Sequence, residues 1–81
     1  MLYVKIPKER VGALIGPEGE VKRQIERACM VELKIDSGTG DVNVMPSEEG
    51  ARQGMVGLNA RDIVKAIARG FSPDRAMKLV S

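Results

Sequence analysis

The chain has 81 residues, which is the length of one small domain. Its 13 Lys and Arg against 11 Asp and Glu give a net charge of +2, too little for a global attraction to nucleic acid, so any such binding needs a local patch. With no His, one Cys and no metal-ligand spacing, the sequence argues against an enzyme, a metal site or another cofactor. No apolar run approaches the length of a membrane span, and the lone Cys favours a cytoplasmic protein.

The N-terminal segment alternates short apolar stretches with turn residues. Residues 3–6 alternate and are rich in β-formers, so they predict a strand that Pro7 ends. Residues 10–15 are apolar and short, which is compatible with either a strand or a helix. The two glycines in residues 16–19 indicate a turn.

A helix and a hairpin are predicted next. Residues 20–29 place apolar side chains on one face of a helix and charged side chains on the other. Residues 31–36 alternate without interruption and predict a strand with one buried face. Residues 37–40 form the hairpin loop, and residues 41–45 form a third strand that Pro46 ends.

Another helix is predicted after Ser47, which is a suitable N-cap. Four apolar residues recur on one side of it: Val56, Ala60, Ile63 and Ile67. Gly54 and Gly57 each cost ~1 kcal/mol relative to Ala in a helix. The first half of this helix is therefore expected to fray, or the helix to begin at Asn59.

The C-terminal segment predicts a short extra helix. Gly70 ends the preceding helix, and Pro73 suits the first position of a new one. Its apolar residues are Ala76, Met77, Leu79 and Val80. We expect Phe71 to anchor this helix on the body of the domain, with a base-stacking platform as the alternative. Residues 1–70 are thus expected to form the domain, and residues 71–81 a helical extension.

The element order β-α-α-β-β-α predicts an α+β fold. Three strands form one sheet, and the helices cover one face of it as a second layer. Aromatic residues are nearly absent, so the core should be aliphatic. Cys29, on the apolar side of its helix, is expected to be a small buried hydrophobe.

The Gly16-x-x-Gly19 turn is the segment whose pattern points to a ligand. Glycine tolerates positive φ and lets a backbone approach closely. Free N–H groups at the start of the following helix favour an anion such as a sugar–phosphate backbone. On these four residues alone an ordinary helix turn is the simpler interpretation, so the context decides.

That context resembles the KH motif, a V-I-G-x-x-G-type segment followed by a helix. The segment reads Val11-Gly12-x-Leu14-Ile15-Gly16-x-x-Gly19-x-Val21-x-x-x-Ile25. The resemblance extends over roughly residues 3–69 and implies a type I KH domain that binds single-stranded RNA. Residues 60–73 further resemble archaeal KH proteins of small-subunit ribosome assembly, which implies rRNA as the ligand. Those proteins carry a second KH domain, so residues 71–81 are expected to begin a linker to one.

The resemblance also assigns roles to residues. Four would meet RNA phosphates in the loop: Gly16, Pro17, Glu18 and Gly19. Four would line an aliphatic groove for unstacked bases: Gly12, Ile15, Val21 and Leu33. Lys22 and Arg23 would pair with phosphates just past the loop. The alternatives are plain core packing for the three aliphatic side chains and a solvated helix face for the two cations.

The middle of the loop departs from the family pattern, which usually has Lys, Arg or small polar residues there. Pro17 lacks an N–H donor, and Glu18 puts a negative charge beside the expected phosphate path. Both Glu18 and Glu20 could instead complement the helix dipole. We therefore expect modest RNA affinity. The alternative function is a KH-fold module that docks a ribosome-assembly or translation factor.

Overall fold

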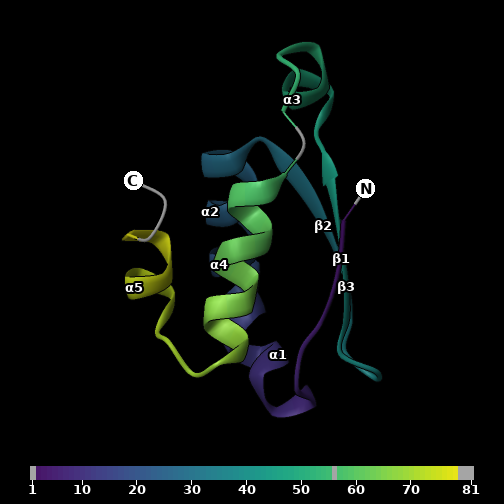
Figure 1. Cartoon of the computed structure of the whole chain (residues 1–81). Helices are drawn as coiled ribbons and strands as arrows, with labels where there is room; N and C mark the ends of the chain where they lie inside the picture. Colours follow the sequence, from purple (N-terminus) through teal and green to yellow (C-terminus); the bar gives the residue numbers. More distant parts are fainter. Residues whose placement is uncertain (1, 56, 79–81) are drawn as a thin grey trace.

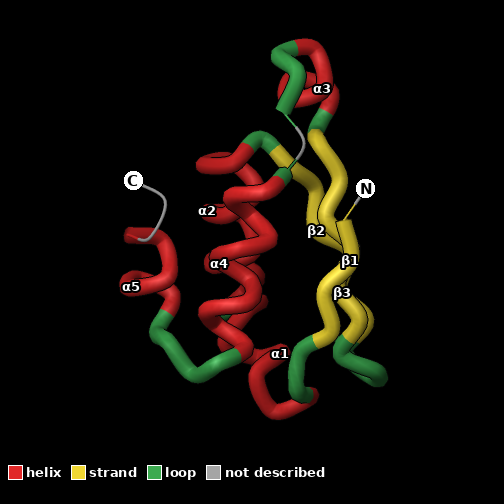
Figure 2. Tube along the Cα trace, in the orientation of Figure 1, coloured by secondary structure: helices red, strands yellow, loops and turns green. Residues whose placement is uncertain are grey.

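The structure, a computed structural model, describes residues 2–55 and 57–78. Its elements in chain order are β1 (Leu2–Lys5), α1 (Lys8–Ile15), the 3-10 turn η1 (Pro17–Gly19), α2 (Glu20–Cys29), β2 (Val31–Asp36), β3 (Asp41–Pro46), α3 (Glu48–Arg52), α4 (Leu58–Ala68) and α5 (Pro73–Lys78). The strands form one antiparallel sheet in the order β1-β3-β2. Helices α1, α2 and α4 cover one face of it, as Figures 1 and 2 show, which confirms the predicted two-layer α+β fold.

The two layers enclose the aliphatic core that the composition predicts. Its largest fully buried side chains are Leu14, Ile25, Ile63, Ile67, Val31, Val42, Val44 and Val64. Among the described residues no polar or charged side chain is buried. Cys29 is buried with them, and this burial raises the pKa of its thiol, as expected of a small hydrophobe. No helix in the described part of the chain is long and apolar enough to span a membrane.

The segment after Ser47 forms two helices, where the prediction was a single helix that frays in its first half or begins at Asn59. Gly54 and Gly57 both adopt positive φ, +74° and +85°, so the chain reverses between α3 and α4. Gly57 serves as the N-cap of α4, which begins one residue before the predicted Asn59 start. Val56, assigned to the apolar side of this helix, lies outside the described residues.

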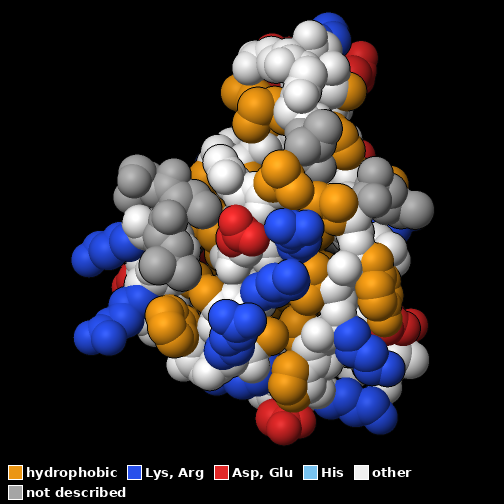
Figure 3. All heavy atoms as spheres, viewed as in Figure 1, with side chains coloured by type: hydrophobic (Ala, Val, Ile, Leu, Met, Phe, Trp, Pro, Cys, Tyr) orange, Lys and Arg blue, Asp and Glu red, His pale blue; other side chains and the backbone are white. Residues whose placement is uncertain are grey.

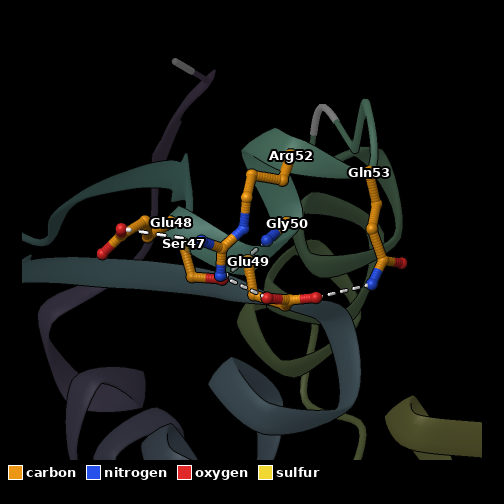
Figure 4. Close-up of polar contacts among 6 residues, drawn as sticks. All are labelled: Ser47, Glu48, Glu49, Gly50, Arg52 and Gln53. Carbon is orange, nitrogen blue, oxygen red and sulfur yellow. Dashed lines mark hydrogen bonds and ion pairs between the residues drawn. The ribbon is translucent and has the colours of Figure 1, made fainter.

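Helix α3 is short, and local polar contacts hold it (Figure 4). The Ser47 Oγ accepts a hydrogen bond from the Gly50 N–H at 3.1 Å, which confirms the predicted N-cap. Glu49 accepts from Arg52 at 2.5 Å and from the Gln53 amide at 3.0 Å. Figure 1 shows this helix beyond the end of the sheet, away from the helical layer.

Helix α5 packs against α4 on the side away from the sheet (Figure 1). Ala76 is fully buried, whereas the Phe71 side chain is 45% exposed. The connection is held instead by Arg10, whose Nε donates to the Ile67 carbonyl at 2.8 Å and whose Nη2 donates to the Phe71 carbonyl at 3.2 Å. The remaining apolar residues assigned to this helix, Leu79 and Val80, lie outside the described residues.

Candidate nucleic-acid interface

The predicted loop lies between the end of α1 and the start of α2. Gly16, Glu18 and Gly19 all adopt positive φ, at +73°, +56° and +77°. The Gly16 N–H donates to the Gly12 carbonyl at 2.8 Å and so ends α1, and the Gly19 N–H donates to the Gly16 carbonyl at 3.2 Å. Helix α2 begins immediately afterwards with no side-chain cap, so its first N–H groups have no side chain bound to them.

The three glycines near the loop have different structural roles. A Cβ on Gly16 would overlap the Val21 side chain, so this glycine is required by packing as well as by its φ. A Cβ on Gly19 would meet only the Arg23 guanidinium, at 3.2 Å, which places that cation beside the loop. Gly12 lies within α1, and nothing lies within 4 Å of the position of a Cβ there. The fold therefore leaves an open surface over Gly12.

The residues assigned to the site differ in how far they reach solvent. Pro17 and Glu18 are exposed at the tip of the loop. Ile15 and Val21 are half-buried and pack against the edge of the core, which is compatible with a groove wall. Leu33 is only 3% exposed, so its side chain belongs to the core. The loop and the two half-buried side chains therefore share one surface.

Glu26 was not assigned to the site by the sequence, but it reaches the edge of the sheet. Strand β2 is an edge strand, and the outward Leu33 N–H donates to the Glu26 Oε2 at 2.9 Å. The same oxygen lies 3.7 Å from the Lys22 Nζ. Lys22 is thus ion-paired within the domain. The i,i+4 spacing of Lys22 and Glu26 was a readable signal of this pair, whereas the contact with Leu33 depends on how α2 packs on β2.

The charges around the loop are mixed. An open groove of about 710 Å³ follows α2 toward the start of α3; its lining residues are Arg23, Glu26, Arg27, Met30, Val31, Glu32, Ser47 and Glu49. Arg23 makes no ion pair with any described residue, so it is available to an anion. Glu18 and Glu20 lie on the loop and at the first turn of α2. The loop therefore offers backbone N–H groups and one free guanidinium against two carboxylates.

Comparison with known proteins identifies the fold. The sequence profile of the KH domain matches residues 1–53, which include β1 to β3 and the whole loop. The chain belongs to the KH domain family. The β-α-α-β-β-α order and the antiparallel sheet are those of a type I KH domain, so the family that the loop pattern resembles is confirmed.

Similar KH proteins are longer than this chain. A KH domain-containing protein of Methanocaldococcus jannaschii is 47% identical over 96% of this chain, which spans 34% of that relative. Dim2p from Pyrococcus horikoshii is 46% identical with a TM-score of 0.90, over 99% of this chain and 48% of Dim2p. A second structure from that organism, an a/eIF2alpha–aDim2p–rRNA complex, matches with the same identity and TM-score over 45% of the matched chain. A polyribonucleotide nucleotidyltransferase of Acidothermus cellulolyticus is 33% identical, and this chain covers 9% of it.

Proposed function

We propose that this KH domain binds single-stranded RNA across the Gly16–Gly19 loop, and that the RNA is rRNA during assembly of the archaeal small ribosomal subunit. The observation that carries the proposal is the loop itself. Three positive-φ positions within the four loop residues, Gly16, Glu18 and Gly19, bring the backbone to the surface directly before the uncapped N-terminus of α2. A KH loop of this kind clamps about four backbone nucleotides.

The proposed path runs over the loop and along the surface between α1 and α2. Phosphates lie against the loop backbone and Arg23, whose guanidinium is next to Gly19. Bases lie over Gly12 and against Ile15 and Val21, where the surface is open or half-buried. Lys22 takes part only if its pair with Glu26 opens. Leu33 contributes its edge N–H more readily than its buried side chain.

The domain is proposed to act without catalysis or a cofactor, as one part of a longer protein. The nucleotidyltransferase relative is matched over only 9% of its length, so its activity does not transfer to this chain. Residues 1–70 would form the KH unit and residues 71–81 would lead toward a second KH domain, since the chain spans about half of Dim2p. The site of action that fits ribosome assembly is the cytoplasm.

A second function is favoured by one set of observations. Glu18 lies in the loop and Glu20 directly follows it. Glu26 forms an ion pair with Lys22 and accepts a hydrogen bond from the Leu33 N–H. A matched structure is a complex that contains a/eIF2alpha as well as rRNA. The alternative is therefore a domain that docks a translation or assembly factor and binds RNA only weakly.

Amide chemical-shift mapping separates the two functions. Addition of a short single-stranded RNA to the ¹⁵N-labelled chain should shift the amides of Gly12, Gly16, Gly19 and Lys22. The Leu33 amide should shift as well, because its hydrogen bond to Glu26 would change. If these amides stay silent with RNA while a translation-factor protein shifts other amides, the docking function replaces RNA binding.

A further inference from the structure

Both aromatic residues of the chain are exposed. The sequence contains one Tyr, one Phe and no Trp. Tyr3 on β1 is 56% exposed and Phe71 after α4 is 45% exposed. Aromatic side chains bury large apolar areas and are commonly used in cores and interfaces. A domain that builds its core only from aliphatic residues while exposing both aromatics has placed them where a ligand can reach them.

A row of cations on α4 separates these two aromatics. Arg61, Lys65 and Arg69 recur at every fourth position of the chain and so follow one face of the helix and its C-terminal turn. Like charges at this spacing destabilise a helix slightly, by about 0.2–0.5 kcal/mol per pair. Figure 3 shows Lys and Arg side chains gathered over α4. We call these three residues the α4 cationic row.

Hollows flank the row on both sides. One, of about 450 Å³ between β1 and α4, has no acidic residue in its lining: Tyr3, Val4, Lys5, Pro7, Lys65, Ala68 and Arg69. The other, of about 480 Å³, has one acid in its lining: Asp62, Lys65, Ala66, Arg69 and Phe71. Lys65 and Arg69 thus line both hollows, and each hollow includes one exposed aromatic.

Few acidic groups neutralise this surface. Asp62 lies 3.7 Å from Arg61 and faces that end of the row. Asp41 stands opposite Lys5 across the sheet and accepts hydrogen bonds from the Tyr3 and Thr39 hydroxyls, so Tyr3 is held in place by a carboxylate that is already engaged. Lys65 and Arg69 make no ion pair with the described residues.

We propose that the α4 cationic row with Tyr3 and Phe71 is a second RNA contact, separate from the loop, that holds the backbone of a longer single strand while bases stack on the aromatic rings. A positively charged surface combined with aromatic rings is the composition of sites that bind single strands without reading sequence. Four helical residues advance the chain by ~6 Å, comparable to the spacing of successive phosphates. An acidic protein segment would satisfy the cations but would leave the two rings without a role.

The inference rests on RNA being the ligand, and oligonucleotide length separates the two sites. A uridine tetramer fills only the loop site, whereas a dodecamer can also reach α4. The double variant Lys65→Gln/Arg69→Gln should weaken dodecamer binding about three- to tenfold at low salt, as expected for two exposed charge pairs. Its slope of log K against log salt should become shallower by ~1.4, or ~0.7 for each phosphate no longer neutralised. Tetramer affinity should not change.

A charge-matched control and an intrinsic probe complete the test. Lys34→Gln/Arg52→Gln removes the same charge from exposed positions that line neither of the hollows beside the row, and it should leave both affinities unchanged. Because Tyr3 is the sole Tyr and no Trp is present, tyrosine fluorescence reports on that ring alone. The dodecamer should quench it, and less so in the Lys65/Arg69 variant.

Three results would overturn the second contact, and each is distinct from failure of the loop site. The first is an unchanged dodecamer affinity and salt slope in the Lys65/Arg69 variant. The second is equal weakening in the control variant, which would reflect net charge alone. The third is fluorescence quenching by a hexaglutamate peptide but not by RNA, which would make the row a site for an acidic protein. If the loop site fails instead, RNA would leave the chemical shifts of the loop amides unchanged while it still quenches the fluorescence of Tyr3.

Discussion

At the scale of single residues, stability and binding place opposite demands on Gly12. It lies inside α1, where Gly is less stable than Ala by roughly 0.5–1 kcal/mol. A Cβ there would meet no other atom, so the fold does not need this glycine. A groove that lets a base approach α1 closely does need it. Gly12→Ala should therefore raise the free energy of unfolding by about that amount and weaken RNA binding. Urea unfolding and RNA titration of the same variant test both effects, and unchanged RNA affinity would place the groove elsewhere.

Glu18 distinguishes the two proposed functions at one position. It is exposed at the tip of the loop and makes no hydrogen bond or ion pair with the described residues. Glu18→Lys reverses a charge beside the proposed phosphate path. Exposed pairs of this kind realise about 0.2–1 kcal/mol each, so RNA affinity at low salt should rise about two- to tenfold, with a smaller gain at high salt.

The control for that variant is Glu9→Lys, since Glu9 is also exposed and lies in the first turn of a helix, but at the far end of α1. It makes the same change in net charge and should alter affinity much less. RNA titrations at two salt concentrations provide the measurement. Equal effects of both variants, or no effect of Glu18→Lys, would mean that RNA does not pass over the loop.

At the scale of elements, the local sequence pattern was sufficient to predict the bounds of an element that has one clear periodicity. The predicted bounds of α2 and β2 match the structure. The apolar residues recur with the helical period in α2 and with the strand period in β2, so each element has one apolar and one charged face. Residues 10–15 were ambiguous because so short an apolar segment fits both periods. The break between α3 and α4 was underestimated: Gly54 and Gly57 act as positive-φ reversals, a role that propensity alone does not reveal.

The candidate site was predictable to a similar extent. The loop and its glycines follow from a local motif, and the structure places them together as expected. The contact of Glu26 with the Leu33 amide does not follow from the sequence, because it depends on the distance and rotation between α2 and β2. The exposure of Phe71, for which anchoring was expected, does not follow from the sequence either; at that point Arg10 donates a hydrogen bond to the Phe71 carbonyl.

Helix α3 tests how far a single cap stabilises a short element. It has five residues and projects beyond the sheet, so the Ser47 N-cap hydrogen bond should contribute a large share of its stability (Figures 1 and 4). Ser47→Ala should cost ~1 kcal/mol, a typical value for an N-cap. Hydrogen exchange of the Gly50 amide should then be about fivefold faster, while core amides of α4 change little. Ser37→Ala, in the exposed hairpin loop, is the control; equal acceleration in both variants would contradict a role for the cap.

At the scale of the whole molecule, the dependence of stability on pH follows from a few surface contacts and from the buried Cys29 thiol, whose pKa burial raises. The hydrogen bond from Tyr3 lowers the pKa of Asp41, with a further contribution from Thr39, and the same bond raises the pKa of Tyr3. Arg52 beside Glu49 lowers the pKa of that carboxyl, and Gln53 adds to this. The chain has no His, so no side chain of that type titrates near neutral pH.

The signs of these shifts predict a plateau with losses at both ends. A lowered carboxyl pKa stabilises the fold above the unfolded value of ~4, and this stability is lost as pH falls through the folded pKa. A raised pKa stabilises the fold below the unfolded value, which is ~8.5 for the Cys29 thiol and ~10 for Tyr3, and this stability is lost as pH rises through the folded pKa. Urea midpoints should therefore be level from about pH 5 to 8 and fall outside that range.

The variant Tyr3→Phe isolates the contribution of one hydrogen bond to that profile. It removes the hydroxyl that donates to Asp41 and keeps the ring. At pH 7 the variant should unfold at a lower urea concentration than the natural chain. At pH 3, below the unfolded pKa of ~4, the difference should shrink as pH falls toward the lowered pKa of Asp41; at pH 11, above the unfolded pKa of ~10, it should shrink as pH rises toward the raised pKa of Tyr3. If the difference in urea midpoint is the same at all three pH values, the Tyr3–Asp41 contact does not govern the pH dependence of stability.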